Sequence, residues 1–426
     1  MKLSFKLFVF MCFCTFFSGN GQGFVKMKDG QFTIKNQPYY YIGANYWYGS
    51  YLGLEKDPQR GIERLKRELD FLKQNNVTNL RVLVGVEGSG QLNGAKRVEP
   101  AYQTSPGVFN DELLKGLDIL MDEMTRRDMK AVLFFSNNWE WSGGWLQYLN
   151  WNGLIDDETA KRALNWDELR DYTSKFYSCE PCIEQYHNQV KRVVTRKNTI
   201  NGKKYKNDAT LMSWEVANEP RPMRAAAIPA FKKFLLNTTA LIKSLDKKHL
   251  VTIGNEGEQG SETIQVFKEI HEDKNVDYLT IHIWPKNWTW LDIKDMEGTF
   301  ERAKNNTVEY ILAHQKVADE LKKPLVLEEF GFPRDQHSFD VNSTTKLRDQ
   351  YYEATFKLFE DSRKKGGTLA GIQFWSFGGE SRPIPGQTYW KSGDDYMGDP
   401  PMEEQGLNAV FDSDQSTWEL IRKYSK

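Results

Sequence analysis

Two kinds of hydrophobic pattern alternate along the chain. Short apolar runs rich in β-branched and aromatic residues favour buried strands, and longer segments with apolar residues every three or four positions favour amphipathic helices. Eight strands are predicted, over Tyr39–Trp47, Thr78–Gly85, Lys130–Asn137, Leu211–Glu219, His249–Gly257, Val276–Pro285, Pro324–Phe332 and Leu369–Gly379. The clearest helices are predicted over Ile62–Gln74, Leu113–Arg127, Phe231–Leu245, Phe300–Lys322 and Trp418–Tyr424.

This alternation of strands and helices predicts right-handed βαβ units and therefore a parallel sheet. Eight such units are what a closed (β/α)8 barrel, the TIM barrel of the α/β class, requires. An open doubly wound sheet would need a glycine-rich phosphate turn after its first strand, and the sequence has none. We therefore expect a single barrel domain over residues 24–426, which opens with a small hairpin over Phe24–Pro38.

The N-terminal residues have the pattern of a targeting segment. Lys2 and Lys6 form a short positive start before an apolar run, Leu7–Phe17. This run is shorter than the ~20 residues needed to span a bilayer. A membrane anchor or a lipid-modified cysteine is the alternative, but neither Cys12 nor Cys14 lies in a convincing lipoprotein context. We expect residues 1–23 to be a cleaved signal peptide, and the protein to be secreted, extracellular or periplasmic, without membrane contact.

The two remaining cysteines, Cys179 and Cys182, lie in the sequence C-E-P-C. In a reducing cell this spacing would suggest a redox pair or half of a zinc site. No other cysteine pair remains after the leader, and the six histidines are scattered, so the second half of a zinc site is missing. In an exported protein a local disulfide between Cys179 and Cys182 is the better interpretation.

Composition and charge exclude some classes of protein. The 426 residues carry 57 basic and 58 acidic side chains, a balance that does not suit a general nucleic-acid binder. Charged residues make up 27% and aromatic residues 13%, so the chain is not disordered. Thirteen Trp and nineteen Tyr are more flat rings than a core of this size needs, which indicates binding of flat, hydroxylated ligands.

Polar and aromatic side chains gather at the C-terminal ends of the predicted strands. The active site of a barrel forms at this rim, because the strand ends and the loops after them converge there. Such residues also serve as helix caps, but their recurrence in all eight units is harder to explain in that way. The residues concerned are Asn45, Tyr46, Trp47, Arg81, Asn137, Asn138, Trp139, Asn218, Glu219, Asn255, Glu256, His282, Trp284, Glu328, Glu329 and Trp375.

Two of these carboxylates suit a specific chemistry. Glu219 ends the fourth strand and Glu329 the seventh, so the two side chains would face each other across the mouth of the barrel. Paired carboxylates on either side of a bond are the equipment of glycoside hydrolysis. From the residues alone, a pair of solvated glutamates is an equally good interpretation.

The motifs N-E-P after the fourth strand and E-F-G after the seventh resemble the clan A glycoside hydrolases, family 5, and within it the β-1,4-mannanases. The resemblance covers nearly all of the mature chain in the right order. Its supporting stretches are PYYYIGANYWYG (38–49), TNLRVLV (78–84), FFSNNWEWSGG (134–144), QYLNW (147–151), TRKNTINGKKYKNDATLMSWEVANEPR (195–221), DYLTIHIWPKNW (277–288) and KPLVLEEFGFPR (323–334).

The resemblance implies roles for both glutamates. Glu219, the Glu of N-E-P, would be the acid/base, and Glu329, directly before Phe330 and Gly331, would be the nucleophile of a retaining mechanism. Glu328 competes for the second role, but the alternation of a strand puts neighbours on opposite faces, so we expect only one of the two to point to the centre.

The resemblance also implies a set of substrate-binding residues. Arg81 would lie beside the nucleophile, Asn218 would bond the sugar 2-hydroxyl, and His282 would bond around the acid/base and the sugar. Trp375 would be the floor of the sugar that is cleaved, and Arg221 would contact a sugar on the leaving-group side.

The remaining expected contacts are aromatic. Trp284 stands where many relatives have a Tyr whose hydroxyl lies near the nucleophile, so that contact is left open. Trp47 and Trp139, at strand ends, are expected to stack on sugar rings.

The resulting hypothesis is a secreted retaining endo-β-1,4-mannanase that acts on mannan, glucomannan or galactomannan, without cofactor or metal, and as a monomer. The alternatives are an exo-acting mannosidase or mannobiohydrolase, a β-1,4-glucanase of the same family, or a non-catalytic glycan-binding barrel. Three long segments, Val86–Asn110, Asn138–Gln185 and Gly379–Asn408, would decide whether the cleft is long or closed at one end.

Overall fold

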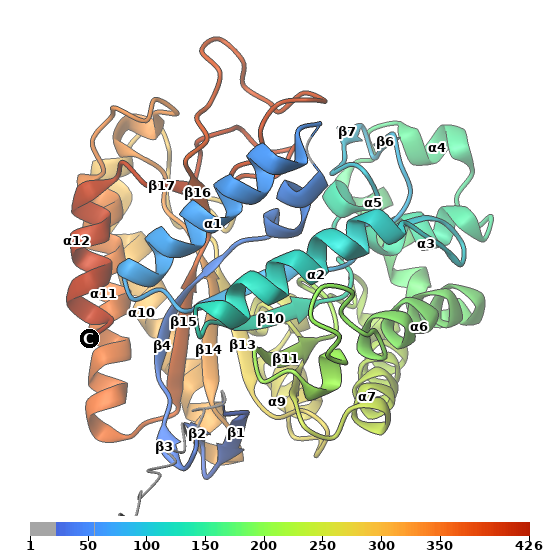
Figure 1. Cartoon of the computed structure of the whole chain (residues 1–426), viewed down its shortest axis with the longest axis horizontal. Coiled ribbons are helices and arrows are strands. Elements are labelled where there is room, and N and C mark those ends of the chain that lie inside the picture. Colours follow the sequence, from blue (N-terminus) through green and yellow to red (C-terminus); the bar gives the residue numbers. More distant parts are fainter. Residues whose placement is uncertain (1–22, 55) are drawn as a thin grey trace, which may run out of the picture.

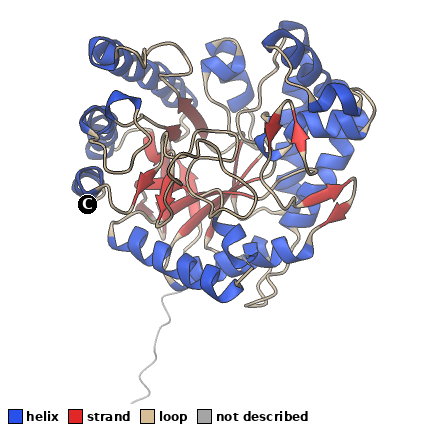
Figure 2. Ribbon diagram, turned by 90° about the horizontal axis from the view of Figure 1, so that it is seen from above, coloured by secondary structure: helices blue, strands red, loops and turns tan. Residues whose placement is uncertain are grey.

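The computed structural model describes residues 23–54 and 56–426, so the predicted signal peptide lies almost wholly outside the described residues. Its centre is one parallel sheet of eight strands in the order β12-β11-β10-β5-β4-β15-β14-β13, surrounded by helices (Figures 1 and 2). The predicted TIM barrel is confirmed. The strands are β4 (Tyr41–Asn45), β5 (Asn79–Leu83), β10 (Lys130–Phe134), β11 (Leu211–Glu215), β12 (Leu250–Thr252), β13 (Leu279–Ile283), β14 (Leu325–Phe330) and β15 (Leu369–Phe374).

The barrel closes between β12 and β13, the two ends of the sheet order. The Asp277 amide donates to the Val251 carbonyl at 2.8 Å, and further up the His282 amide donates to the Glu256 carbonyl at 3.2 Å. The Thr252 hydroxyl donates to the Tyr278 carbonyl at 2.9 Å between these two points. These bonds bring the ends of β12 and β13 to the same rim as the other six strands.

Amphipathic helices form the outer layer, as predicted. In α1 the side chains of Leu65, Leu69 and Leu72, spaced by four and three residues, are buried against the sheet, and Asp57 caps the first turn by accepting from two backbone amides. The long outer helices are α1 (Pro58–Gln74), α2 (Asp111–Arg126), α6 (Glu180–Val194), α7 (Ile228–Leu245), α9 (Ile264–His271), α10 (Met296–Leu321), α11 (Lys346–Lys365) and α12 (Gln415–Tyr424).

A small antiparallel sheet covers the N-terminal end of the barrel (Figure 1). It consists of β1 (Val25–Lys28), β2 (Gln31–Ile34) and β3 (Gln37–Pro38), so the predicted hairpin has a third strand. Phe32 from β2 lies edge-on to Tyr278 with a centroid distance of 5.2 Å. This aromatic plug leaves the opposite end of the barrel as the one that is open to ligands.

The three long segments all lie at that open end. Val86–Asn110 carries β6 (Gln91–Leu92), β7 (Ala95–Lys96), β8 (Gln103–Ser105) and β9 (Val108–Phe109). Asn138–Gln185 carries α3 (Gly144–Trp151), α4 (Asp157–Lys161) and α5 (Trp166–Thr173). Seen from above, loops cross the centre of the barrel mouth (Figure 2). Gly379–Asn408 begins at β16 (Phe377–Gly379), which pairs with β17 (Val410–Phe411).

The disulfide between Cys179 and Cys182 is confirmed, with Cα atoms 5.2 Å apart. The bridge lies at the start of an outer helix and not within a rim loop. Cys179 is instead the N-cap of α6, and its sulfur accepts from the amide of Cys182 at 3.2 Å. The bridge therefore fixes the first turn of an outer helix. Among the described residues no helix is long and apolar enough to cross a membrane.

Candidate active site

Glu219, Glu329, Trp375 and Asn218 meet at the C-terminal end of the barrel, where they line a cavity of about 470 Å³. They come from the ends of β11, β14 and β15, far apart in the sequence but neighbours around the rim. The cavity is therefore built in the place that the positions of these residues at strand ends predict.

Glu219 is held by the backbone around it. Its amide donates to the Gly254 carbonyl at 2.9 Å, and the amide of Asn218 donates to the Ser136 carbonyl at 2.8 Å. Glu219 adopts a left-handed backbone conformation with φ of 50°. Such a conformation costs a residue with a side chain of order 1 kcal/mol or more, and it persists only where the surroundings impose it. This turn directs the carboxyl group into the cavity.

Three nitrogen atoms surround the carboxyl group of Glu219. Trp284 donates its indole N–H to Oε1 at 3.2 Å, Nδ1 of His282 lies 2.8 Å from the same oxygen, and Trp139 donates its N–H to Oε2. Burial raises the pKa of Glu219, and Arg221 and the two indoles oppose this effect. A carboxyl group with a raised pKa is suited to donate a proton near neutral pH.

Arg81, fully buried on β5, organises the other half of the site. Its five N–H groups reach the two oxygens of Glu215 at 3.0 and 2.6 Å, Oδ1 of Asn45 at 3.1 Å, Oδ1 of Asn218 at 2.8 Å, and Oε1 of Glu329. A guanidinium has five such donors, so every one of them is used. Arg81 lies beside Glu329, as expected.

Burial raises the pKa of Glu329 well above its usual range, Arg81 lowers it, and Glu219 raises it further. The bond from Arg81 is therefore the contact that favours the ionised form which a nucleophile needs. Without this guanidinium the pKa of Glu329 would be raised still further.

The neighbour of Glu329 departs from the expected alternation. Along β13 and β14, Ile281 pairs with Leu327 but His282 pairs with Glu329, so Glu328 is an extra residue in the ladder. Such an irregularity interrupts the alternation of side chains between the two faces of a strand. The expectation that Glu328 and Glu329 point to opposite faces is therefore wrong.

Glu328 is also turned toward the barrel axis, but it lies below the cavity. Its Oε2 is 3.7 Å from Nε of Arg81 and 3.7 Å from Nε2 of His282, and the side chain is fully buried. Burial and the nearby Glu215 raise the pKa of Glu328 well above its usual range. Glu329, and not Glu328, lines the cavity, which supports Glu329 as the reacting residue.

The two catalytic candidates are close together. One carboxyl oxygen of Glu219, one of Glu329 and a ring nitrogen of His282 all lie within 4.8 Å of one another. Retaining glycosidases separate their carboxyl groups by about 5–5.5 Å, and inverting enzymes by about 6.5–9.5 Å. The spacing therefore suits direct attack by one carboxylate. The same three side chains are donors of the kind that bind a divalent cation, so the expected absence of a metal stays a prediction.

Comparison with known proteins agrees with this geometry. Residues 22–426 match the family model described as glycoside hydrolase family 5 beta-mannosidase-like. The chain belongs to this family.

Relatives with names are similar over most of their length. Mannan endo-1,4-beta-mannosidase 3 of Arabidopsis thaliana is 31% identical over 380 residues, covering 84% of this chain and 82% of the relative. The family 5 mannosidase of Rhizomucor miehei is 31% identical, covers 96% of this chain and 98% of its own, and has a TM-score of 0.84. The endo-1,4-beta-mannanase of the same organism is 22% identical, and the alignment covers 94% of this chain and 98% of the mannanase. Its TM-score of 0.67 shows that it shares the fold.

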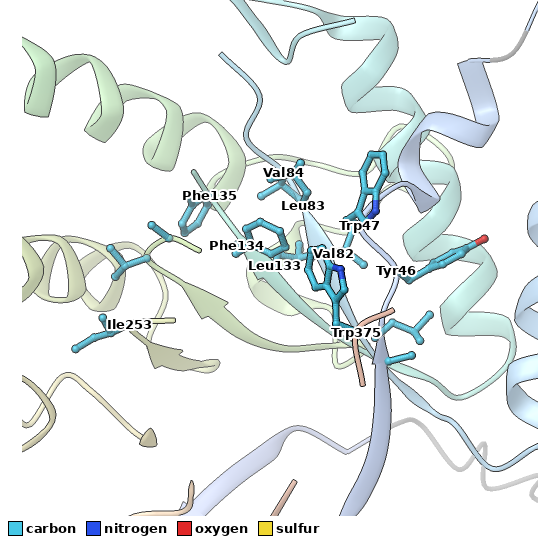
Figure 3. Close-up of a cluster of buried hydrophobic side chains, with 14 of the residues drawn as sticks. Tyr46, Trp47, Val82, Leu83, Val84, Leu133, Phe134, Phe135, Ile253 and Trp375 are labelled. Carbon is cyan, nitrogen blue, oxygen red and sulfur yellow. The ribbon is translucent and has the colours of Figure 1, made fainter. Parts of the chain in front are cut away.

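Within this family 5 barrel, one expected sugar contact is wrong. Trp47 has no exposed surface, and its N–H donates to the Gly398 carbonyl at 2.7 Å. Its ring packs edge-on against Trp141 and Tyr396 at centroid distances of 5.9 and 5.5 Å. Figure 3 shows Trp47 and Trp375 among buried side chains from neighbouring strand ends. Trp47 therefore braces a wall of the site, because the segment Gly379–Asn408 folds over it.

The other expected binding residues fall into two groups. Asn218, Trp139, Trp284, Trp375 and Arg221 line the cavity. Arg81 and His282 have no exposed surface and reach the cavity only through the two glutamates. Trp284 turns its N–H to Glu219, so it contacts the acid/base candidate and does not replace a hydroxyl beside Glu329.

Several residues of the site are not found by sequence reasoning. Glu256, noted only as a strand-end residue, pairs with Arg221, whose guanidinium carbon lies 5.0 Å over the ring of Trp139. Glu403, from the segment after β16, and Trp166, from α5, also line the cavity. Both stand in the long segments between barrel strands, where the strand and helix pattern of the barrel does not indicate which side chain faces the site.

We expect the loss of Arg81 to destabilise the fold in a pH-dependent way. In Arg81→Met the carboxyl groups of Glu215 and Glu329 stay buried without their cation, which typically costs about 3–5 kcal/mol. The folded-state pKa of Glu329, already raised by burial, then rises further, so the folded state binds more protons than the unfolded chain and stability falls as pH increases. Urea unfolding at pH 7 and near pH 4.5 would measure this difference.

The matched control is Arg162→Met, which removes an ion pair with Glu168 on the surface. Exposed pairs contribute about 0–1 kcal/mol, so this variant should lose little stability at either pH. An Arg81→Met protein with the same small loss, or with a loss that shrinks as pH rises, would contradict the proposed electrostatic role.

Proposed function

We propose that the protein is a retaining β-mannoside hydrolase that removes mannose from the non-reducing ends of β-1,4-linked manno-oligosaccharides. The observation that carries the proposal is the pair of buried carboxyl groups, Glu219 and Glu329, within 4.8 Å of each other at the mouth of a family 5 barrel. The relatives support mannose as the sugar, since they include a mannan endo-1,4-beta-mannosidase and a family 5 mannosidase.

In the proposed reaction, a carboxylate oxygen of Glu329 attacks C1 of the sugar while Glu219 gives its proton to the glycosidic oxygen. The C1–O bond breaks, the leaving sugar departs with that proton, and a glycosyl ester to Glu329 is formed. Glu219, now ionised, then takes a proton from water as the water oxygen attacks C1 and releases the ester. Two displacements at C1 retain the anomeric configuration.

Other residues prepare these steps. Arg81 favours the ionised form of Glu329, and the donors around Glu219 stabilise the carboxylate that exists between the two steps. Nδ2 of Asn218 donates one hydrogen to Asn137 at 3.1 Å and has a second one for the sugar 2-hydroxyl. Trp375, at 3% exposure, provides a flat floor for the ring that is cleaved.

The wall beyond Trp375 supports exo action. Trp375 packs edge-on against Trp141 at 6.3 Å, and Trp141 packs in turn against the fully buried Trp47. The N–H of Trp47 fixes the backbone of Gly398 over this cluster. A sugar chain that extended past the floor ring would have to displace these packed rings, so we infer that the cleft is closed on the glycone side.

The endo-mannanase hypothesis is the second candidate. It is favoured by the curated relatives, which are mannan endo-1,4-beta-mannosidases such as the tomato protein numbered 5, 29% identical over 373 residues and 82% of its length. A β-1,4-glucanase would share the glutamate pair and differ only in the substrate. Secretion and a monomeric state also remain proposals, and the disulfide at Cys179 supports an oxidising compartment.

Product analysis over time on linear β-1,4-mannan and manno-oligosaccharides, with carboxymethyl cellulose alongside, tests the proposal. We expect mannose from the first time points and little change in mannan viscosity, because the closed wall admits only chain ends. Short oligosaccharides with an early fall in viscosity would establish the endo candidate instead. Activity on cellulose alone would overturn the substrate, and no activity on any of these would favour a glycan-binding barrel.

The two glutamates should respond differently to substitution. Glu329→Ala removes the nucleophile and should lower turnover of every substrate by at least roughly a thousandfold, with the fold retained by circular dichroism. Glu219→Ala should cost about 10²–10⁴-fold on manno-oligosaccharides but much less on a dinitrophenyl β-mannoside, which needs no proton to leave. Substantial turnover by Glu329→Ala would move the nucleophile to Glu328.

The pH profile should respond to Trp284. Its N–H bond to Glu219 favours the carboxylate, so Trp284→Phe should raise the pKa of Glu219. Since Glu219 must be protonated in the first step, the basic limb of kcat/KM on mannotriose should move to higher pH. Trp390→Phe, whose N–H bonds the Asp394 carbonyl away from the cavity, is the control and should leave the limb in place. A basic limb of kcat/KM that moves to lower pH in Trp284→Phe would contradict this prediction.

A further inference from the structure

The structure holds a second aromatic platform beside the proposed catalytic centre. We infer that Trp166 binds a sugar ring on the leaving-group side, one position further from the cleaved bond than the sugar at Trp139. The inference rests on the proposed function and adds a binding position for the chain that leaves. Trp166 has no role in the chemical steps described above.

The position of Glu219 defines which side this is. Glu219 protonates the glycosidic oxygen in the proposed reaction. The leaving sugar therefore lies beyond that oxygen, on the side away from Glu329 and Trp375. Trp139 donates its N–H to Glu219 and therefore stands at the start of the leaving-group side. Trp166 lies next to Trp139, with ring centroids 6.3 Å apart and an interplanar angle of 27°, and both rings line the cavity.

Exposure distinguishes Trp166 from the other rings of the site. Its exposed fraction is 52%, whereas Trp375 has 3% and Trp141 has 4%. A single exposed apolar residue is common on protein surfaces and needs no explanation by itself. Trp166, however, faces the cavity and continues the stack that Trp139 begins. Flat aromatic rings bind the C–H faces of sugars with little loss of side-chain entropy.

The helix that carries Trp166 is fixed to the chain just after the acid/base. Arg170 of α5 donates to the Met223 carbonyl at 2.7 Å, and Nε of Arg224 donates to Asp171 of α5 at 2.7 Å. The segment that contains Met223 and Arg224 follows Glu219 and Pro220 directly. Trp166 is thus held at a set position relative to the catalytic carboxyl group.

The start of α5 is also locally rigid. Asn165 and Glu168 form a reciprocal capping box, in which each side chain bonds the backbone amide of the other residue. Trp166 is the first residue inside this capped turn. A ring that is pre-positioned in this way loses little freedom on binding, which is the property expected of a binding platform.

The test compares Trp166→Ala with the unchanged enzyme on a nitrophenyl β-mannoside, mannobiose and mannotriose. Only mannotriose places a second sugar on the leaving-group side. We expect its kcat/KM to fall roughly 3- to 12-fold, the effect of losing one aromatic stacking contact, while the other two substrates change less than about twofold. Trp166→Tyr keeps a flat ring and should recover most of the activity on mannotriose.

Leu154→Ala is the matched control, because Leu154 is 42% exposed on the same insertion and does not line the cavity. It should leave all three substrates unchanged. An unchanged kcat/KM of Trp166→Ala on mannotriose would falsify the inference. An equal loss on all three substrates would also overturn it, since Trp166 would then act on the catalytic pair.

The failure of the proposed function is a separate result. If the unchanged enzyme hydrolyses none of these mannosides, the proposed function is wrong, and mannotriose binding then decides the role of Trp166. Calorimetric titration of the unchanged protein and of Trp166→Ala with mannotriose should still give a roughly 3- to 12-fold difference in Kd. Equal values of Kd, or no binding to either protein, would reject the platform.

Discussion

The architecture of the site depends on a single buried guanidinium. Arg81 donates all five of its N–H groups, to Glu215, Asn45, Asn218 and Glu329, and so joins side chains from the ends of β4, β11 and β14. Burying a charged group away from water costs several kcal/mol of folding free energy unless the group is paired and hydrogen-bonded. These carboxylates and amides are the partners that compensate for the burial of Arg81. The same bonds aim the proposed nucleophile, so stability and reactivity share one interaction.

Around this cation the protonation states are unequal. Burial lowers the pKa of His282 well below its usual range, so this ring stays neutral between the glutamates. Burial raises the pKa values of both Glu328 and Glu329 well above their usual range, but of these two only Glu329 accepts a hydrogen bond from Arg81 that opposes the shift. The direct bond from Arg81 favours the ionised form of Glu329, whereas Oε2 of Glu328 lies 3.7 Å from Nε of Arg81. Separation of the pKa values of neighbouring carboxyl groups is how one site provides both an acid and a nucleophile.

The sequence predicts the barrel and the catalytic pair because both depend on local patterns. Strand and helix periodicity mark the eight units, and Glu219 and Glu329 stand in short motifs at strand ends. The position of Glu328 depends on a register shift against β13, which no local pattern records. The burial of Trp47 depends on the backbone of Gly398, about 350 residues later in the chain. Long-range packing thus decides what the residue type alone leaves open.

Tryptophan shows how far the surroundings determine the role of a side chain. Trp284 donates its N–H to Glu219, the proposed acid/base, whereas Trp47 donates its N–H to the backbone of a loop and braces a wall of the site. Trp375 presents a sheltered face to the cavity, and Trp166 presents a face that is half exposed. Each ring has the same chemistry, so its function follows from two measurable properties: the partner of its nitrogen and the surface that it leaves uncovered. On this basis we propose that the wall at Trp47 and the platform at Trp166 give the cleft a direction, with one sugar bound inside it and the rest of the chain extending outward.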